Sequence, residues 1–427
     1  MKKEIITSER LGEQYTVLRH KSGCTVCLYP TKNKTAAALF STRYGSVDTT
    51  FKTAADPDYV TVPEGIAHYL EHKLFESDER NVFDLFAETG ANVNAYTNFG
   101  ETTYLFLSTK DFAKNLRLLL NFVQQPYFTD ENVEKERGII EQEIKMYLDD
   151  PGTRVFYNCL DAVYHRNPVR IDIAGTVESI QRIDKELLYR CYNTFYNLNN
   201  MVLAIVGSFD PDEALSICDE LLKPKDDPEI SVLVPEEPPA VREKYAVQTL
   251  PCAVPLFTIG FKMPLPEKSE QIRLLILLNL ALDTALGKNS DFYCRLYDEG
   301  LIDDSFGSGV FQGRGFFLPF VSGESRDPGY VRDEVLKELE RCQKEGLSRE
   351  DFEIVKRMTY GDTLKSFENI GGIGRRVLNA HLFGSNAYAN IEYTAAAGYE
   401  EVNDALRRLD LGNHSLSVVE PPKEKEE

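Results

Sequence analysis

Residues 65–75 read Gly-Ile-Ala-His-Tyr-Leu-Glu-His-Lys-Leu-Phe, and they are the most informative stretch of the chain. A helix is predicted to begin near Pro63, because proline is favoured in a first helical turn. On this helix His68 and His72 are four residues apart and lie on one face, where two imidazoles can bind one metal ion. Glu71 lies at the edge of that face, so it can reach a metal-bound water without being a ligand. The order His-x-x-Glu-His is the inverse of His-Glu-x-x-His.

A third metal ligand must come from another part of the chain, because hydrolytic zinc sites have three protein ligands and an open position for water. A second amphipathic helix is predicted over residues 131–148, and it carries the glutamates Glu134, Glu136, Glu141 and Glu143. Glu136 and Glu143 are two helical turns apart and face the same way. A run of charges on a helix is more often only a solvated face. The alternative is therefore a pair of surface helices without a metal.

Composition and charge limit the functions that fit the chain. It has 427 residues, enough for two to three domains, with 42% hydrophobic and 27% charged residues, which is ordinary for a globular protein. The 48 basic and 68 acidic residues give a net charge of -20, which argues against nucleic acid and anionic membranes as partners. Neither a signal peptide nor a transmembrane segment is predicted. The eight cysteines are scattered and do not resemble a disulfide framework, so a cytoplasmic protein is expected.

The chain is predicted to consist of two halves. Residues 223–244 contain five prolines and many charges, and they predict an extended linker between a domain at 1–222 and a domain at 245–427. The expected order of strands and helices is similar in the two halves, which indicates a diverged duplication. Residues 371–374, Gly-Gly-Ile-Gly, are interpreted as a flexible break between helices, with a peptide-contacting loop as the alternative.

Periodicity and turn signals place the individual elements. In the first half, strands are predicted at 25–28, 36–44 and 202–206, a hairpin at 91–98 and 102–109, and helices at 63–76, 81–88, 110–124 and 131–148. In the second half, a strand is predicted at 253–263, and helices at 271–286, 291–297, 330–344 and 349–367.

On these residues the chain resembles the insulinase/pitrilysin metallopeptidases, the inverzincins, and most of all their processing-peptidase branch. The resemblance rests on residues 65–75 and on residues 134–143, with further likeness at Gly45-Ser46, at 94–97, at 175–180 and at 195–207. It covers nearly all of the first half, whereas in the second half only the general pattern and length fit. It implies an α+β fold of two tandem related domains, each an antiparallel-rich β-sheet packed against α-helices on one side.

The resemblance also implies a role for each matching residue of the metal motif. His68, His72 and Glu143 would be zinc ligands, and Glu136 would be a carboxylate that orients a ligand. Glu71 would be the general base, which takes a proton from the attacking water and passes it to the leaving amine. Zinc supports this chemistry because it lowers the pKa of bound water from about 15.7 toward 7.

The substrate implied by the resemblance is a peptide. Asn94 and Ala95 would lie on an edge strand, to which an unfolded peptide or small protein segment adds as a further strand. The chain is thus expected to be a zinc-dependent endopeptidase. Two alternatives stay open, namely a non-hydrolytic peptide-binding or scaffold subunit of a heteromeric complex, and a protein with a structural zinc. An intact general base argues against the first, and structural zinc sites usually have four protein ligands, which argues against the second.

One departure from the family pattern concerns the second half. Active members usually carry an Arg and, seven residues later, a Tyr that bind the substrate carbonyl. When the Gly-Leu at 300–301 is aligned with the family, Leu296 and Asp303 occupy these positions, and Arg295 and Tyr297 lie nearby at the wrong spacing. The chain is therefore expected to work as a dimer with a related chain that lacks the zinc motif and supplies the Arg/Tyr pair.

Overall fold

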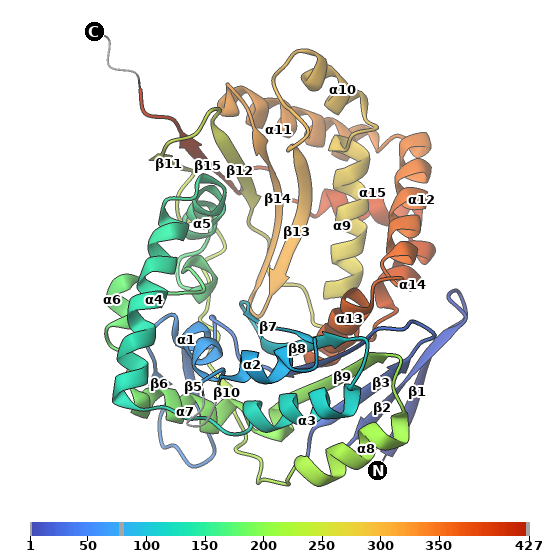
Figure 1. Ribbon diagram of the computed structural model, residues 1–427. Helices are drawn as coiled ribbons and strands as arrows, with labels where there is room; N and C mark the ends of the chain where they lie inside the picture. The colour runs from blue at the N-terminus through green and yellow to red at the C-terminus, as the bar shows by residue number, and fades with distance from the viewer. Residues whose placement is uncertain (1, 77–80, 424–427) are drawn as a thin grey trace. The chain divides into compact units, whose positions relative to one another are not determined.

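The computed structural model describes residues 2–76 and 81–423, which form two compact units (Figure 1). Unit 1 consists of Met1–Ile144, Asp172–Leu233 and Leu364–Ala389, and unit 2 of Lys145–Ile171, Val234–Thr363 and Asn390–Glu427. Each unit therefore takes one segment from the opposite half of the chain. The linear division at 223–244 describes the order of the halves along the sequence and stays a prediction, whereas the packing units interleave.

Unit 1 is built on a seven-stranded sheet. Its strand order is β1 (Lys2–Ser8), β2 (Glu13–Arg19), β3 (Thr25–Pro30), β9 (Met201–Gly207), β4 (Ala36–Thr42), β8 (Thr102–Ser108) and β7 (Asn92–Thr97). Every neighbouring pair is antiparallel except β3 and β9. The central strands β4 and β9 are buried along their whole length, which explains why apolar residues dominate their sequences. A small separate sheet joins β5 (Thr50–Lys52), β6 (Val60–Thr61) and β10 (Ser231–Val232).

Helices cover both faces of this sheet. On one face lie α1 (Ile66–Lys73), α2 (Val82–Ala87), α3 (Phe112–Val123), α4 (Asp130–Leu148), α6 (Val177–Ile180), α7 (Lys185–Phe195) and α8 (Pro211–Leu221). Phe40 of β4 packs in the same buried cluster as residues of these helices. Its neighbour Leu39 points to the opposite face, because side chains alternate along a strand. There it meets α13 (Ile370–Phe383), so the expectation of helices on one side was wrong for unit 1.

The glycines at 371–374 lie inside α13, and the predicted flexible break was wrong. Asn369 caps the helix by accepting a hydrogen bond from the backbone N–H of Gly372 at 2.8 Å. A β-carbon at Gly374 would lie 2.5 Å from Leu39 Cδ1, so the missing side chain lets α13 approach the sheet closely. Glycine has the same sequence signature in a flexible break and in close packing, and only the tertiary neighbour distinguishes the two.

Unit 2 repeats this architecture on a five-stranded sheet. Its strand order is β11 (Tyr245–Thr249), β15 (His414–Glu420), β12 (Leu256–Phe261), β14 (Phe316–Glu324) and β13 (Gly307–Gly313). The first pair is parallel and the other pairs are antiparallel. This order matches β3, β9, β4, β8 and β7 of unit 1 strand for strand. The shared topology confirms that the two parts are related.

The sheet of unit 2 also carries helices on both faces. The core on one face involves α9 (Gln271–Leu286), α10 (Asp291–Asp298), α11 (Pro328–Glu345), α12 (Arg349–Lys365) and α15 (Tyr399–Arg407), and α14 (Ala389–Ala396) precedes α15. On the other face lies α5 (Pro151–Val163), and a β-carbon at Gly260 of β12 would lie 2.7 Å from Cys159 Sγ. Hence α5 covers the second face of the unit 2 sheet, as α13 covers the second face of the unit 1 sheet.

The described residues also form two short 3₁₀ helices, η1 (Pro168–Arg170) and η2 (Leu198–Asn200). Most predicted elements are present within a few residues of their expected bounds, and α9 begins and ends at the predicted residues. Among the described residues, no helix combines the length and the apolar character that crossing a bilayer requires.

Candidate metal centre

The helix α1 presents the two histidines of the motif on one face. The ring centroids of His68 and His72 lie 4.6 Å apart. The helix begins after Gly65, whose φ of +88° is a conformation that favours glycine, and a β-carbon there would lie 2.4 Å from the carbonyl oxygen of Ala174. The helix is shorter than the predicted range 63–76, because it begins at Ile66 and ends at Lys73.

Glu143 of α4 faces both imidazoles. Its Oε1 lies 3.6 Å from His68 Nε2, and its Oε2 lies 3.5 Å from His72 Nε2. Atoms that bind one tetrahedral zinc at about 2.1 Å lie about 3.4 Å from one another. The spacing and the two-nitrogen, one-oxygen chemistry of this set therefore fit a zinc ion. In the described part of the chain, His68, His72 and Glu143 form the group of His, Cys, Asp and Glu side chains that could hold a metal.

Glu136 orients one of these histidines from behind. Its Oε1 lies 3.0 Å from His72 Nδ1, so the other ring nitrogen is directed toward Glu143. Burial alone would raise the pKa of Glu136, but the hydrogen bond and the charge of His72 lower it overall. For His72, burial lowers the pKa, and the contact with Glu136 and the neighbouring carboxylates raise it overall. The prediction that Glu136 and Glu143 share one face of α4 agrees with these contacts.

His68 is suited to metal binding by its environment. It is 8% exposed, and burial together with the charge of His72 lowers its pKa to about 3. The ring is therefore neutral near pH 7, which is the form that binds a metal. Its Nδ1 is buried and has no hydrogen-bond partner among the described residues.

Glu71 lies on the same helix and contacts the sheet. Its Oε2 accepts a hydrogen bond from the Thr97 hydroxyl at 2.8 Å, at the end of β7. Burial raises the pKa of Glu71, although Thr97 and the charge of His72 oppose the shift. A carboxylate whose pKa is moved toward neutrality is better suited to accept and return a proton.

The two residues expected to bind substrate lie on β7, the last strand of the unit 1 sheet. Asn94 is exposed and Ala95 is half-buried, and the backbone N–H of Ala95 donates to Asn94 Oδ1 at 2.8 Å. In the described residues β7 pairs with β8 alone, so its outer edge is available for another strand.

Comparison with known proteins agrees with this geometry. The sequence matches the insulinase family (peptidase family M16) over residues 55–177 and the domain described as "Peptidase M16 inactive domain" over residues 182–359. It is 40% identical over 371 residues to a Bacillus subtilis (strain 168) protein named "Uncharacterized zinc protease YmfH", with 85% of this chain and 86% of that one covered. The chain belongs to peptidase family M16.

Two further similar proteins support the fold and the resemblance to the processing-peptidase branch. A putative M16-like peptidase from Alicyclobacillus acidocaldarius is 37% identical and superposes with a TM-score of 0.91, covering 96% of this chain and 98% of that one. The mitochondrial-processing peptidase subunit beta of Caenorhabditis elegans is 30% identical over 161 residues, which cover 36% of this chain and 35% of that one. The family resemblance and the α+β fold are thereby confirmed.

Two residues of the M16 motif that the sequence did not single out fix α1 against α4. The Tyr69 hydroxyl donates to the carbonyl oxygen of Val133. Lys73 Nζ donates to the carbonyl oxygen of Asn132 at 2.9 Å and lies 2.8 Å from Glu76 Oε2. Lys73 is fully buried, which is rare for lysine. The spacing of Tyr69 and Lys73, four residues apart and so on one face of the helix, was the available signal.

The residues at the Arg/Tyr positions of the M16 family lie in unit 2. Leu296 is fully buried in the core of that unit, and Asp303 Oδ1 accepts a hydrogen bond from the backbone N–H of Ser305 at 2.9 Å. Arg295 pairs with Glu334 at 2.8 Å, and Tyr297 stacks on a neighbouring tyrosine of α10. The expected departure from the Arg/Tyr pattern at Leu296 and Asp303 stays a prediction.

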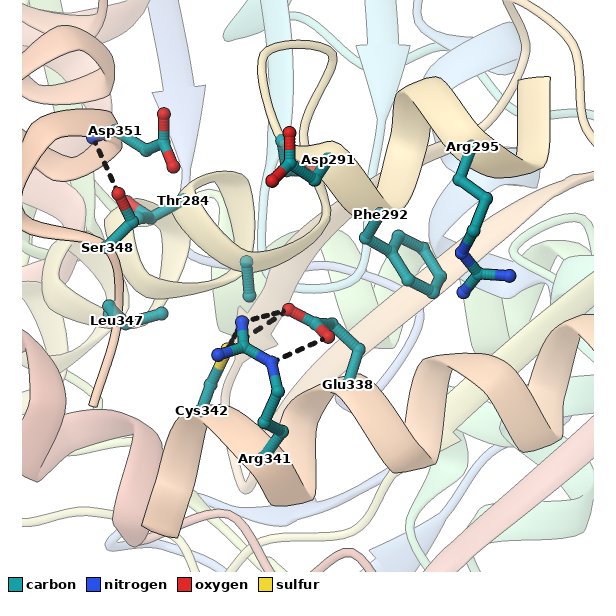
Figure 2. Close-up of a pocket in the computed structure, with 12 residues that line it drawn as sticks. Thr284, Asp291, Phe292, Arg295, Glu338, Arg341, Cys342, Leu347, Ser348 and Asp351 are labelled. Carbon is teal, nitrogen blue, oxygen red and sulfur yellow. Dashed lines mark hydrogen bonds and ion pairs between the residues drawn. The ribbon is translucent and has the colours of Figure 1, made fainter. Parts of the chain in front are cut away.

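A pocket of about 540 Å³ in unit 2 does not carry comparable chemistry. It lies between α9, α10, α11 and the start of α12 (Figure 2). Its Arg341 is hydrogen-bonded to Glu338, and its Arg295 is paired with Glu334. Burial raises the pKa of Cys342 to about 12, so this thiol is a poor nucleophile. The pocket lacks histidine among its lining residues, and the metal-binding side chains converge in unit 1 instead.

Proposed function

We propose that this M16 protein is a zinc-dependent endopeptidase that hydrolyses peptide bonds in unfolded peptides or small protein segments. The observation that carries the proposal is the convergence of His68, His72 and Glu143 next to the half-buried Glu71. A protein related over most of its length is named a zinc protease, which supports the same activity.

Each side chain of the site would have a separate role in hydrolysis. His68, His72 and Glu143 would hold zinc, and Glu136 would keep the His72 ring in place through its 3.0 Å contact. When bound, zinc lowers the pKa of a water molecule and polarises a carbonyl group. Glu71 would accept a proton from the attacking water and later donate it to the leaving amine.

The substrate would bind along β7 in an extended conformation. A peptide strand that pairs with the outer edge of β7 uses main-chain hydrogen bonds, which recognise peptides with little regard to their sequence. The Ala95 N–H donates to the Asn94 side chain in the free strand, and a substrate carbonyl would take the place of that side chain. Unfolded segments offer their whole backbone for such pairing, which favours them as the substrate class.

The experiment that tests the activity is cleavage of a quenched, unstructured peptide pool by the zinc-loaded protein, with the variant Glu71→Gln in parallel. We expect the wild type to cleave, and the variant to retain zinc but lose turnover, because glutamine cannot accept the proton. Zinc content by atomic absorption separates loss of the base from loss of the metal. Cleavage by the variant at the wild-type rate would refute the role of Glu71.

We propose further that the active form is a dimer with a related chain that lacks the zinc motif and contributes the Arg/Tyr pair. The burial of Leu296 in the core supports this, since no cation occupies that position. Cleavage by the protein alone at the same rate as with a co-expressed related chain would refute the need for a partner. Zinc-loaded protein that binds peptide without cleaving it in either form would favour the scaffold alternative.

A cytoplasmic location also belongs to this proposal. All eight cysteines are free thiols and six of them are buried, which fits a compartment where thiols stay reduced. Fractionation of the native cells would test it, and recovery outside the cytoplasmic fraction would contradict it.

A further inference from the structure

We propose that Thr97 is a positioning residue for the general base: it holds the Glu71 carboxylate in one orientation and links that orientation to the strand on which the substrate pairs. This inference rests on the proposed function of the site, and it adds a residue that acts through Glu71 rather than on the substrate.

The contact that carries the inference joins the sheet to the metal-binding helix. Thr97 Oγ1 donates to Glu71 Oε2 at 2.8 Å, and the same hydroxyl has a weaker contact with Thr102 Oγ1 at 3.4 Å. A glutamate side chain has three rotatable bonds, so it reaches one position reproducibly only when a partner holds it. The Thr97 hydroxyl therefore restrains the orientation of the Glu71 carboxylate.

Thr97 is itself held firmly because the turn that follows it is anchored. Asn98 Oδ1 accepts hydrogen bonds from the backbone N–H groups of Gly100 and Glu101, both at 2.9 Å. The carbonyl oxygen of Asn98 accepts from the N–H of Ser46 at 3.0 Å. A β-carbon at Gly45 would lie 2.4 Å from the nitrogen of Gly100, so the turn packs directly against the loop after β4.

A buried carboxylate anchors the same turn from the other face of the sheet. Glu101 is fully buried and accepts from Asn98 Nδ2 at 3.0 Å. Asn379 of α13, with its amide nitrogen directed at Glu101, donates to it at 2.9 Å. The position of Thr97 is therefore fixed by β4 and by α13 as well as by its own strand.

The same strand carries the expected substrate contacts. Ala95 and Thr97 are two residues apart on β7, so their side chains lie on the same face of the sheet. A peptide that pairs with β7 therefore lies along the strand that carries the Thr97 hydroxyl, next to the base it holds. The strand thus aligns the substrate and Glu71 together.

The test compares Thr97→Val, which removes the hydroxyl but keeps the shape, with Thr97→Ser, which keeps the hydroxyl. Thr103→Val is the matched control, because it removes the buried Thr103 hydroxyl that donates to Ser41 on the neighbouring strands. We expect Thr97→Val to lower kcat about tenfold or more with KM and zinc affinity unchanged. Thr97→Ser should restore kcat, and Thr97→Val should have no further effect in the Glu71→Gln background.

A readout that needs no turnover accompanies the kinetics. Crystal structures of the wild type and Thr97→Val should show Glu71 in one orientation in the first and in alternative orientations in the second. The inference fails if Glu71 keeps its orientation in Thr97→Val, or if Thr103→Val lowers kcat equally. Turnover by Glu71→Gln at the wild-type rate would instead refute the proposed function, which distinguishes the two failures.

Discussion

Single residues set the chemistry of the site through their distances to neighbours. His72 illustrates this, because one ring nitrogen contacts Glu136 at 3.0 Å while the other faces Glu143 at 3.5 Å. A histidine held in this way presents its lone pair in one direction only. The ordering of the ring, and not the mere presence of a second imidazole, makes the pair on α1 suitable for a metal.

We predict that Glu136→Gln weakens zinc binding or turnover by about 10–100-fold, because it removes the carboxylate that orients His72. The exposed residue Glu131 offers a matched control on the same helix, and Glu131→Gln should leave both properties unchanged. Zinc affinity is measured by competition with a chromophoric chelator. Equal zinc affinities in the two variants and the wild type, with unchanged kcat, would show that His72 does not need Glu136 to orient its ring.

At the scale of elements, the site depends on the register between α1 and α4. Tyr69 and Lys73 bind consecutive backbone carbonyls of α4, at Val133 and Asn132. Glu136 and Glu143 follow on the same helix, so their heights relative to the histidines depend on these two contacts. A helix of eight residues has little stability of its own and needs such tertiary contacts.

We predict that Lys73→Met lowers the free energy of unfolding by about 1–3 kcal/mol, because it removes the hydrogen bond that the buried Lys73 ammonium donates to the carbonyl oxygen of Asn132. The same change at Lys114, which is largely exposed and pairs with Glu88, should have almost no effect. Urea unfolding of the metal-free variants measures both. An unchanged urea midpoint in Lys73→Met would contradict a net stabilising contribution of this hydrogen bond.

The buried Glu101 makes the stability of unit 1 depend on pH. Burial raises its pKa from 4.5 to about 7 in the folded protein. Between these values the folded protein keeps a proton that the unfolded chain has lost, so stability is full below about pH 4.5 and falls as the pH rises to about 7. The shift corresponds to a loss on the order of 3 kcal/mol.

We predict that Glu101→Gln removes most of this decline, so that the variant is more stable than the wild type at pH 8 and similar to it near pH 4.5. Unfolding free energies measured across this range test the prediction. Glu178→Gln, a change of an exposed glutamate in α6, is the control and should follow the wild-type curve. Parallel curves for wild type and Glu101→Gln would contradict the assigned shift.

At the scale of the whole molecule, the two units are interleaved in sequence. The segment Leu364–Ala389 belongs to unit 1 although it follows most of unit 2 along the chain, and Lys145–Ile171 belongs to unit 2 although it lies in the first half. Each sheet is therefore covered on one face by a helix from the opposite half, α13 or α5. The two similar sheets therefore each need a covering helix from the opposite half of the chain.

We predict that residues 1–222 and 245–427, produced separately, do not fold stably. The fragment 1–222 lacks α13, which leaves the outer face of β4 and β9 uncovered, and it retains α5 without its sheet. Co-expression of the two fragments should restore soluble protein, because all covering helices are then present. Circular dichroism and thermal melts of each fragment provide the measurement, and a cooperative melt of 1–222 alone near the full-length midpoint would refute the prediction.

The sequence by itself determined the local features whose causes are local. The spacing in residues 65–75 predicted the two histidines on one face, and the seven-residue interval predicted that Glu136 and Glu143 share a face of α4. Apolar periodicity predicted α9 at its observed bounds. These inferences hold because helical geometry depends only on residue spacing.

Only the tertiary structure decided which distant residues meet. The contact between Thr97 and Glu71, the burial of Lys73 against α4, and the packing of Gly374 on Leu39 each join segments that sequence spacing cannot relate. The interleaving of the units has the same origin, since composition near residues 223–244 marks a change along the chain but not which helix covers which sheet. Such choices depend on the shape of the whole core, where burial of apolar surface outweighs order along the chain.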